Sequence, residues 1–248
     1  MRIIISPAKK MNTDDSLPFH DLPCFLAQAE ELKQYMQGLS YEEAKTLWKC
    51  NDQLADLNFK RFACMDLHRN LTPAILSYEG IQYQYMAPGV FETESMTYIQ
   101  EHLRILSGFY GVLRPFDGIT PYRLEMQAKA AVSGTKDLYA FWGDRLYHAV
   151  TSDDHTILNL ASKEYSRCIE AYLTPEDTNI TCVFGEFLNG KVMQKATLAK
   201  MARGEMVRFL ADHHIDEPNG AKQFDRLGFR FHEELSSGTE YVFLKDAE

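Results

Sequence analysis

Three arginines surround a glycine-bracketed turn in the middle of the chain, within Leu103–Met126 (LRILSGFYGVLRPFDGITPYRLEM). They are Arg104, Arg114 and Arg123, against only two acidic residues in the same stretch. Guanidinium groups and free backbone N–H groups are common partners of phosphate. The stretch therefore indicates an anion-binding site. An ordinary turn between two elements and a buried salt-bridge network are the alternatives.

Two helices are expected to position this turn. Four apolar residues recur at three- and four-residue spacings, which predicts an amphipathic helix: Met96, Ile99, Leu103 and Leu106. Ser107 and Gly108 end that helix, and Gly108 and Gly111 allow positive φ and a close backbone approach. Arg114 and Pro115 are typical of the start of a second, short helix.

A lysine pair follows the first predicted strand. Met1–Ser6 is a β-branched run typical of a buried strand, and Pro7 leads from it to Lys9 and Lys10. Ligand-binding groups often gather where a rigid sheet holds a loop. An ordinary solvated lysine pair explains the same two residues.

A second basic segment lies in the C-terminal half, where residues 191–208 carry five basic residues against one glutamate. Lys195–Leu210 has the apolar spacing of a helix, and Lys200 and Arg203 lie three residues apart on one face. That face could follow a row of phosphates, although charged helix faces are usually only solvated. Gly204 inside the helix costs about 1 kcal/mol relative to alanine, which suggests a close contact with another backbone.

Polar residues at the ends of predicted elements allow a catalytic interpretation. They are Ser6, Lys9, Tyr122, Arg123, Glu125, Asp144 and Asn159. If they converge on one pocket, Lys9 would be a nucleophile or anion binder, and Glu125 or Asp144 a proton carrier. Capping and turn formation explain several of these positions without any ligand.

The common metal and nucleotide motifs are missing from the sequence. None of the eight histidines forms a Glu-x-x-His or His-x-x-x-His pair, so we expect no dedicated metal site. The chain also lacks a P-loop, a Gly-x-Gly-x-x-Gly fingerprint and a Gly-x-Ser-x-Gly elbow. No cofactor is predicted.

Composition indicates a folded protein of the cytoplasm that does not enter the membrane. The 248 residues are 45% hydrophobic and 25% charged, and no apolar run approaches the length of a membrane span or signal peptide. The five cysteines include no Cys-x-x-Cys pair and are expected to be reduced structural thiols. The net charge of −9 opposes a general affinity for nucleic acid, so any attraction must be local.

Helical and strand patterns interleave along the chain, which favours one α+β domain over residues 1–248. Helices are expected over 25–36, 41–57 (capped by Ser40), 136–150 and from 162. Strands are expected over 156–160, 180–188 and 241–245, and Asn189-Gly190 is typical of a tight hairpin turn.

Five segments, in this order, resemble the YaaA family of bacterial peroxide-stress proteins over nearly the whole chain: IISPAKKM, LRILSGFYGVLRPFDGITPYRLEM, DLYAFWGD, NLASKEY and KMARGEMVRFL. The resemblance implies a cytoplasmic bacterial protein that limits peroxide damage by keeping free iron low. It also implies a single mixed α/β domain, with a helix-hairpin-helix element at about residues 95–117 and a basic cleft that binds DNA.

Transferred to this sequence, the resemblance places the DNA contacts at Lys9, Lys10, Ser107, Gly108, Tyr110, Gly111, Arg114, Arg123, Lys195, Lys200 and Arg203. The hairpin reads Gly-x-x-Gly where DNA-binding hairpins usually have Gly-x-Gly. The segment Gly80–Phe91 also departs from the family's usual Tyr-x-Gly-Leu turn.

Two alternative functions are therefore expected. The first is non-catalytic DNA binding through phosphates, largely without sequence preference. The second is an enzyme acting on a nucleobase, nucleotide or damaged nucleic acid at a pocket near Lys9, Arg123 and Glu125. Since no ligand set for iron is found, an effect on iron would be indirect. Convergence of Lys9, Arg123 and Lys200 on one concave face would unite these motifs.

Overall fold

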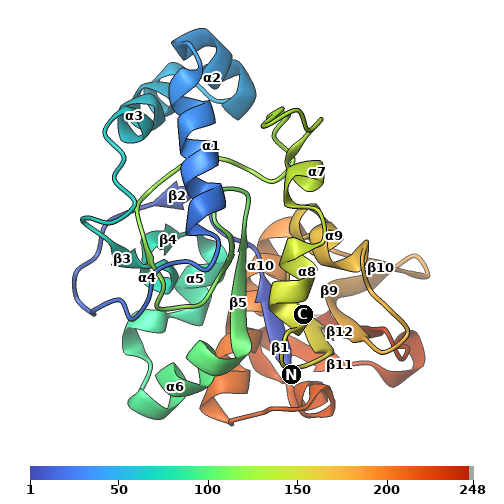
Figure 1. Cartoon of the computed structure of the whole chain (residues 1–248). Helices are drawn as coiled ribbons and strands as arrows, with labels where there is room; N and C mark the ends of the chain where they lie inside the picture. Colours follow the sequence, from blue (N-terminus) through green and yellow to red (C-terminus); the bar gives the residue numbers. More distant parts are fainter. Residues whose placement is uncertain (246–248) are drawn as a thin grey trace.

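Parallel strands form the middle of an eight-stranded sheet in the computed structural model, which describes residues 1–245 (Figure 1). The five parallel strands, in sheet order, are β12 (Glu240–Lys245), β9 (Thr178–Leu188), β8 (Thr156–Asn159), β1 (Arg2–Ile5) and β5 (Leu103–Ser107). Antiparallel strands complete it: β11 (Phe229–Phe231), β6 (Gly111–Leu113) and β10 (Lys191–Met193). Because central parallel strands are covered on both faces, β1 carries the fully buried run Ile3–Ile5.

Helices cover both faces of this sheet, with α8 and α9 in front and α10 behind in the view of Figure 1. The later helices are α7 (Leu138–Trp142), α8 (Arg145–Thr151), α9 (Lys163–Glu170) and α10 (Ala196–Asp212). Between β1 and β5 lie α1 (Leu26–Gly38), α2 (Tyr41–Trp48), α3 (Asp52–Ala63), α4 (Ala74–Ser77), α5 (Ile81–Met86) and α6 (Thr93–His102). The predicted mixture of α and β structure in one domain is confirmed, and the largely parallel sheet makes it an α/β arrangement.

Short strand pairs and 3₁₀ helices complete the fold. Two small antiparallel pairs lie outside the main sheet: β2 (Lys10–Met11) with β4 (Tyr78–Glu79), and β3 (Thr72–Pro73) with β7 (Gly118–Ile119). The 3₁₀ helices are Pro88–Val90, Pro218–Gln223, Arg226–Gly228 and Glu233–Leu235. Within residues 1–245, none of the helices combines the length and apolar character that a membrane span needs.

Two long predicted helices are each divided into two. The predicted helix over 41–57 breaks at Lys49, which is left-handed (φ 48°), and Asn51 caps α3 through its side chain. The predicted cap Ser40 is confirmed, because it forms a reciprocal capping box with Glu43 at the start of α2. The predicted helix over 136–150 breaks at Gly143 (φ 54°). Local residues with positive φ therefore override the apolar periodicity.

The predicted helix-hairpin-helix is wrong. The first helix, α6, ends at His102, and Leu103–Ser107 continues as β5, which pairs with β1 and β6. The predicted second helix, from Val112, is strand β6. Since every residue of β5 is buried, its apolar spacing could not distinguish a helix from a central strand. The glycine turn is therefore a β-hairpin turn inside the fold.

Glycines allow two close backbone contacts that shape the fold. At Gly204 in α10, a Cβ would overlap the carbonyl oxygen of Gln82 and lie 2.9 Å from the backbone nitrogen of Met86, both in α5. The predicted close contact at Gly204 is thus confirmed as a helix crossing. At Gly108, a Cβ would lie 2.9 Å from the backbone nitrogen of Met126, so the segment before Met126 packs directly on the β5–β6 turn.

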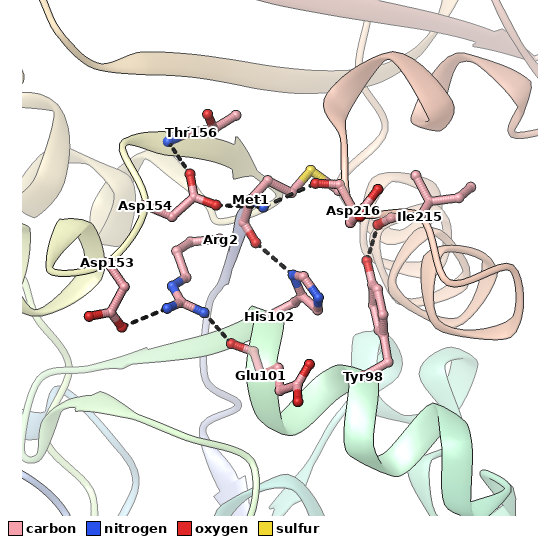
Figure 2. A network of polar contacts seen from close by, with 10 residues as sticks. All are labelled: Met1, Arg2, Tyr98, Glu101, His102, Asp153, Asp154, Thr156, Ile215 and Asp216. Atoms are coloured by element: carbon pink, nitrogen blue, oxygen red, sulfur yellow. Dashed lines mark hydrogen bonds and ion pairs between the residues drawn. The ribbon is translucent and has the colours of Figure 1, made fainter.

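The amino group of Met1 is buried in a polar network at the amino end of β1 (Figure 2). It lies 2.7 Å from the Asp154 carboxylate and donates to the carbonyl of Asp216. Burial alone would raise the pKa of Asp154. Hydrogen bonds from the Met1 amino group and the Thr156 N–H, together with the positive charge of that amino group, outweigh burial and hold the pKa below its usual value. The network ties β1 to the segments before β8 and after α10.

Candidate functional site

Two strand ends meet at the point where the sheet's connections change direction. Strand β1 leads on to β5 on one side, whereas β8 leads on to β9 on the other. In open α/β sheets, ligands bind beyond the carboxyl ends of the strands at such a point. Here Ser6 follows β1 and Ser162 follows β8. The Ser162 backbone N–H donates to Ser6 Oγ (2.8 Å), and Ser6 Oγ donates to Ser162 Oγ (3.1 Å).

A pocket of about 430 Å³ opens at this position, and we call it the switch-point pocket. Its charged lining comprises Lys9, Lys10, Arg123, Lys200, Arg203, Glu79, Glu125 and Glu164. Other side chains in the lining include Ser6, Gln82, Tyr83, Tyr122, Ser162 and Tyr165. The five cations outnumber the three carboxylates, so the pocket is locally positive in a chain whose net charge is −9.

Ion pairs occupy three of the five cations. Glu125 bridges two of them, with Oε2 at 2.9 Å from Lys9 Nζ and Oε1 at 3.0 Å from Arg123 Nη2. Lys10 pairs with Glu79 at 2.6 Å. Lys200 and Arg203 have no carboxylate within salt-bridge distance among the residues that the structure describes. These two cations of α10 are therefore available to an anionic ligand.

Unpaired buried N–H donors also belong to three residues of the lining. Within the described part of the chain, Arg123 Nε, Arg203 Nε and Gln82 Nε2 are buried without a hydrogen-bond partner. They come from the segment after β7, from α10 and from α5. A buried donor without an acceptor costs about 1–3 kcal/mol, so a ligand that supplies oxygen acceptors would recover that free energy.

Tyrosine hydroxyls form a buried chain behind the pocket. Ser107 Oγ accepts from the backbone N–H of Tyr110 (2.8 Å) and lies 2.7 Å from the Tyr122 hydroxyl, which lies 2.8 Å from the Tyr78 hydroxyl. Burial raises the pKa of Tyr122 to about 12. Tyr83 fixes the loop after β1 by donating to the carbonyl of Ser6 (3.0 Å). These hydroxyls therefore stay protonated, and their hydrogen bonds hold the wall of the pocket in place.

One carboxyl of the pocket is perturbed towards its neutral form. Burial raises the pKa of Glu164, and the negative charge of Glu125 acts in the same direction against the lowering effect of the Gln127 backbone N–H. Glu164 lies at the start of α9, which follows Ser162. A carboxyl with a raised pKa is a group that can hold or transfer a proton.

The structure brings together most of the predicted cations and polar groups. Lys9, Arg123 and Lys200 share the switch-point pocket, as the sequence-based interpretation required. The other predicted residues in the lining are Ser6, Lys10, Tyr122, Glu125 and Arg203.

Other predicted residues lie elsewhere. Asp144 is exposed and pairs with His148 at 3.5 Å, and Lys195 pairs with Glu186 at 2.8 Å. Arg114 is exposed near the end of β6, and the amide of buried Asn159 bonds Thr181. None of these four lines the pocket. The predicted hairpin contacts Ser107, Gly108, Tyr110 and Gly111 are all buried in the fold, so a ligand in solvent cannot reach them.

Sequence reasoning missed several residues of the pocket. Ser162, Glu164 and Tyr165 lie in the segment NLASKEY, which carries part of the family resemblance, and the pairing of β8 beside β1 would have placed them next to Ser6. Gln82 and Tyr83 lie in α5, which is too short for a periodic signal. For α5, the sequence pattern offers no signal that points to the pocket.

No group of three or more His, Cys, Asp or Glu side chains in residues 1–245 could hold a metal ion. The excess of cations over carboxylates gives the lining the character of an anion site, and three tyrosines line it as well. A family model described as "Peroxide stress protein YaaA" matches residues 1–235. The chain belongs to the YaaA family of peroxide stress proteins.

Relatives of this chain match it over nearly its whole length. A UPF0246 protein of Lachnoclostridium phytofermentans is 59% identical over 99% of this chain and 96% of its own length. UPF0246 proteins of Lactiplantibacillus plantarum (56% identical) and Agathobacter rectalis (54%) each match 98% of this chain, and 99% and 98% of their own lengths. Four of the five segments that carry the YaaA resemblance also supply pocket residues.

Proposed function

We propose that this protein acts in the peroxide stress response by binding DNA through phosphate contacts in the switch-point pocket, largely without sequence preference. The observation that carries the proposal is the convergence of Lys200, Arg203 and Arg123 on one pocket from distant parts of the chain. The family match supports the stress response, and the pocket's local positive charge supports an anionic partner. An effect on iron would then be indirect, through protection of the DNA or through another metabolite.

The cations of α10 are expected to contribute most of the affinity. Arg203 presents a buried Nε–H without an acceptor, and burial lowers the pKa of its guanidinium, so a phosphate would relieve an unfavourable environment. Lys200 is exposed at the rim, where it can attract a phosphate over a longer range. In contrast, Lys9 and Arg123 are partly neutralised by Glu125.

The proposal is tested by the binding of a fluorescent oligonucleotide at several salt concentrations. Lys200→Ala and Arg203→Ala should each weaken binding of unrelated sequences equally and reduce the slope of log K against log [salt] by about 1. Lys195→Ala is the matched control, because Lys195 carries the same charge beside the same helix but lies outside the pocket and is paired with Glu186. Unchanged binding by both pocket variants would reject the proposal.

A second candidate function is chemistry on a nucleobase, nucleotide or damaged nucleic acid bound in the same pocket. It is favoured by the raised pKa of Glu164 next to the Lys9–Glu125–Arg123 cluster. Product analysis after incubation with nucleotides and with oxidised oligonucleotides tests it. Turnover that is lost in Glu164→Gln while binding is retained would establish it, and the absence of any product would leave binding alone.

A further inference from the structure

We propose that Gln82 recognises the edge of a nucleobase, so that the switch-point pocket receives one unpaired nucleotide with its base inserted. This inference rests on the proposed phosphate binding and specifies it. It distinguishes a pocket that holds a whole nucleotide unit from a surface that touches only the sugar-phosphate backbone.

The amide of Gln82 is buried and unpaired. The residue is only 7% exposed, lines the pocket, and its Nε2 atom has no hydrogen-bond partner among residues 1–245. A glutamine amide offers both donors and an acceptor in one plane, as the edge of a base does. The Nε2 donor alone would also suit a phosphate oxygen, but the amide oxygen is an acceptor that an ionised phosphate cannot use, so a base edge matches the whole amide better.

The backbone of Gln82 is held in place from two sides. Its carbonyl oxygen lies so close to Gly204 of α10 that a Cβ at position 204 would overlap it unless the backbone shifted. The next residue, Tyr83, donates its hydroxyl to the carbonyl of Ser6 and so fixes α5 against the loop after β1. A rigidly placed polar group discriminates well, because a ligand that lacks the matching atoms leaves that group unpaired.

The lining includes groups suited to a base and groups suited to a phosphate. Tyr83 and Tyr165, which are buried, contribute aromatic rings to the lining, and planar bases stack on such rings. Arg203 and Lys200 approach from α10 and supply the cationic wall. The volume of about 430 Å³ lies within the range of small-molecule pockets and is too small for a duplex. A base must therefore leave its stack to enter.

The experiment measures competition of the four deoxynucleoside 5′-monophosphates and of deoxyribose 5-phosphate, which lacks a base, against a labelled single-stranded oligonucleotide. We expect at least one nucleotide to bind ten or more times as tightly as the sugar phosphate. Gln82→Leu should remove most of that difference and leave the binding of deoxyribose 5-phosphate within twofold. Gln84→Leu is the control, since Gln84 is exposed on the same helix.

The outcomes separate this inference from the proposed function. If the oligonucleotide binds but a base adds nothing to the affinity of the sugar phosphate, the inference falls and phosphate binding stands. If no phosphate compound and no oligonucleotide binds, the proposed function itself falls. Gln82→Glu keeps the side-chain shape and guards against misfolding of the leucine variant. It should change which base is preferred, and an unchanged order of preference would contradict the role of Gln82.

Discussion

Gly204 of α10 lies directly against the carbonyl oxygen of Gln82 in α5. This contact sets the distance between the helix that carries Lys200 and Arg203 and the helix that carries Gln82. A Cβ at position 204 would also come within 2.9 Å of the Met86 backbone nitrogen. Because both neighbours are backbone atoms, neither can move aside as a flexible side chain would.

Gly204→Ala should therefore destabilise the protein by about 1–3 kcal/mol, the usual cost of overpacking, although alanine is the better helix former. Urea unfolding followed by circular dichroism measures the change. Gly38→Ala is the matched control, since Gly38 ends helix α1 and a Cβ added there would meet no atom within 4 Å, and it should be neutral or slightly stabilising. Equal effects of the two substitutions would contradict the close crossing.

Glu125 acts as an internal counter-ion in the switch-point pocket. It is 17% exposed at its side chain and contacts both Lys9 and Arg123. Glu125→Gln removes one negative charge while keeping the shape of the side chain, so the affinity for an oligonucleotide should rise about three- to tenfold at low salt. Fluorescence anisotropy measures it. A loss of affinity would mean instead that Glu125 contacts the ligand directly. Glu42→Gln, at an exposed position of α2, should leave the affinity unchanged.

A substitution in the glycine turn distinguishes a structural role of this turn from a role in DNA binding. Gly111 has φ +77°, and a Cβ there would lie 2.9 Å from the side chains of Phe25, Trp142 and Leu146. Gly111→Ala should therefore lower the free energy of unfolding by more than about 1 kcal/mol, through strain and crowding together. Thermal unfolding checks this. A variant with unchanged stability but weaker DNA binding would restore the hairpin as a binding element.

The sequence predicts turns and helix ends best, where one or two residues determine the local backbone conformation. The Asn189-Gly190 turn joins β9 to β10 as predicted, and Ser40 caps α2. The cationic set of the pocket is indicated by the family resemblance and not by local signals of that kind, because solvation alone explains the lysine pair and the charged face of α10. Those signals are carried by one or two residues and do not depend on tertiary context.

The secondary structure of a segment is predicted poorly where the segment is buried on all sides, because its hydrophobic residues then show no clear helix or strand periodicity. Leu103–Ser107 is apolar enough to be either a helix or a central strand, and only its pairing with β1 decides the outcome. The same limit hides Gln82, whose burial depends on the crossing of α5 and α10. Neither sheet order nor helix crossing can be read from a single stretch of residues.

Stability should decline in acid through Asp177, which joins three segments around the start of β9. Burial raises its pKa, but hydrogen bonds from the Thr174 N–H, from His155 and from Tyr147 lower it more, to about 2. Since the folded pKa lies below the unfolded value of 3.8, the stabilisation is complete above about pH 4 and is lost as the pH falls towards 2. Asp177→Asn should flatten this acid limb in urea unfolding, whereas Asp144→Asn, at an exposed pair, should preserve it.

Asp117 should have the opposite effect at higher pH. It is 4% exposed, and burial raises its pKa to about 7 despite the hydrogen bond from the Arg114 N–H. Between pH 4 and 7 the folded chain holds a proton that the unfolded chain releases, so stability falls as the pH rises through this window. Asp117→Asn retains an acceptor for Arg114 and removes the ionisation. Its stability relative to the parent should therefore increase from pH 4 to pH 8, by at most about 4 kcal/mol at 1.36 kcal/mol per pKa unit. A difference between the two proteins that does not change with pH would show that Asp117 is ionised throughout in the folded state.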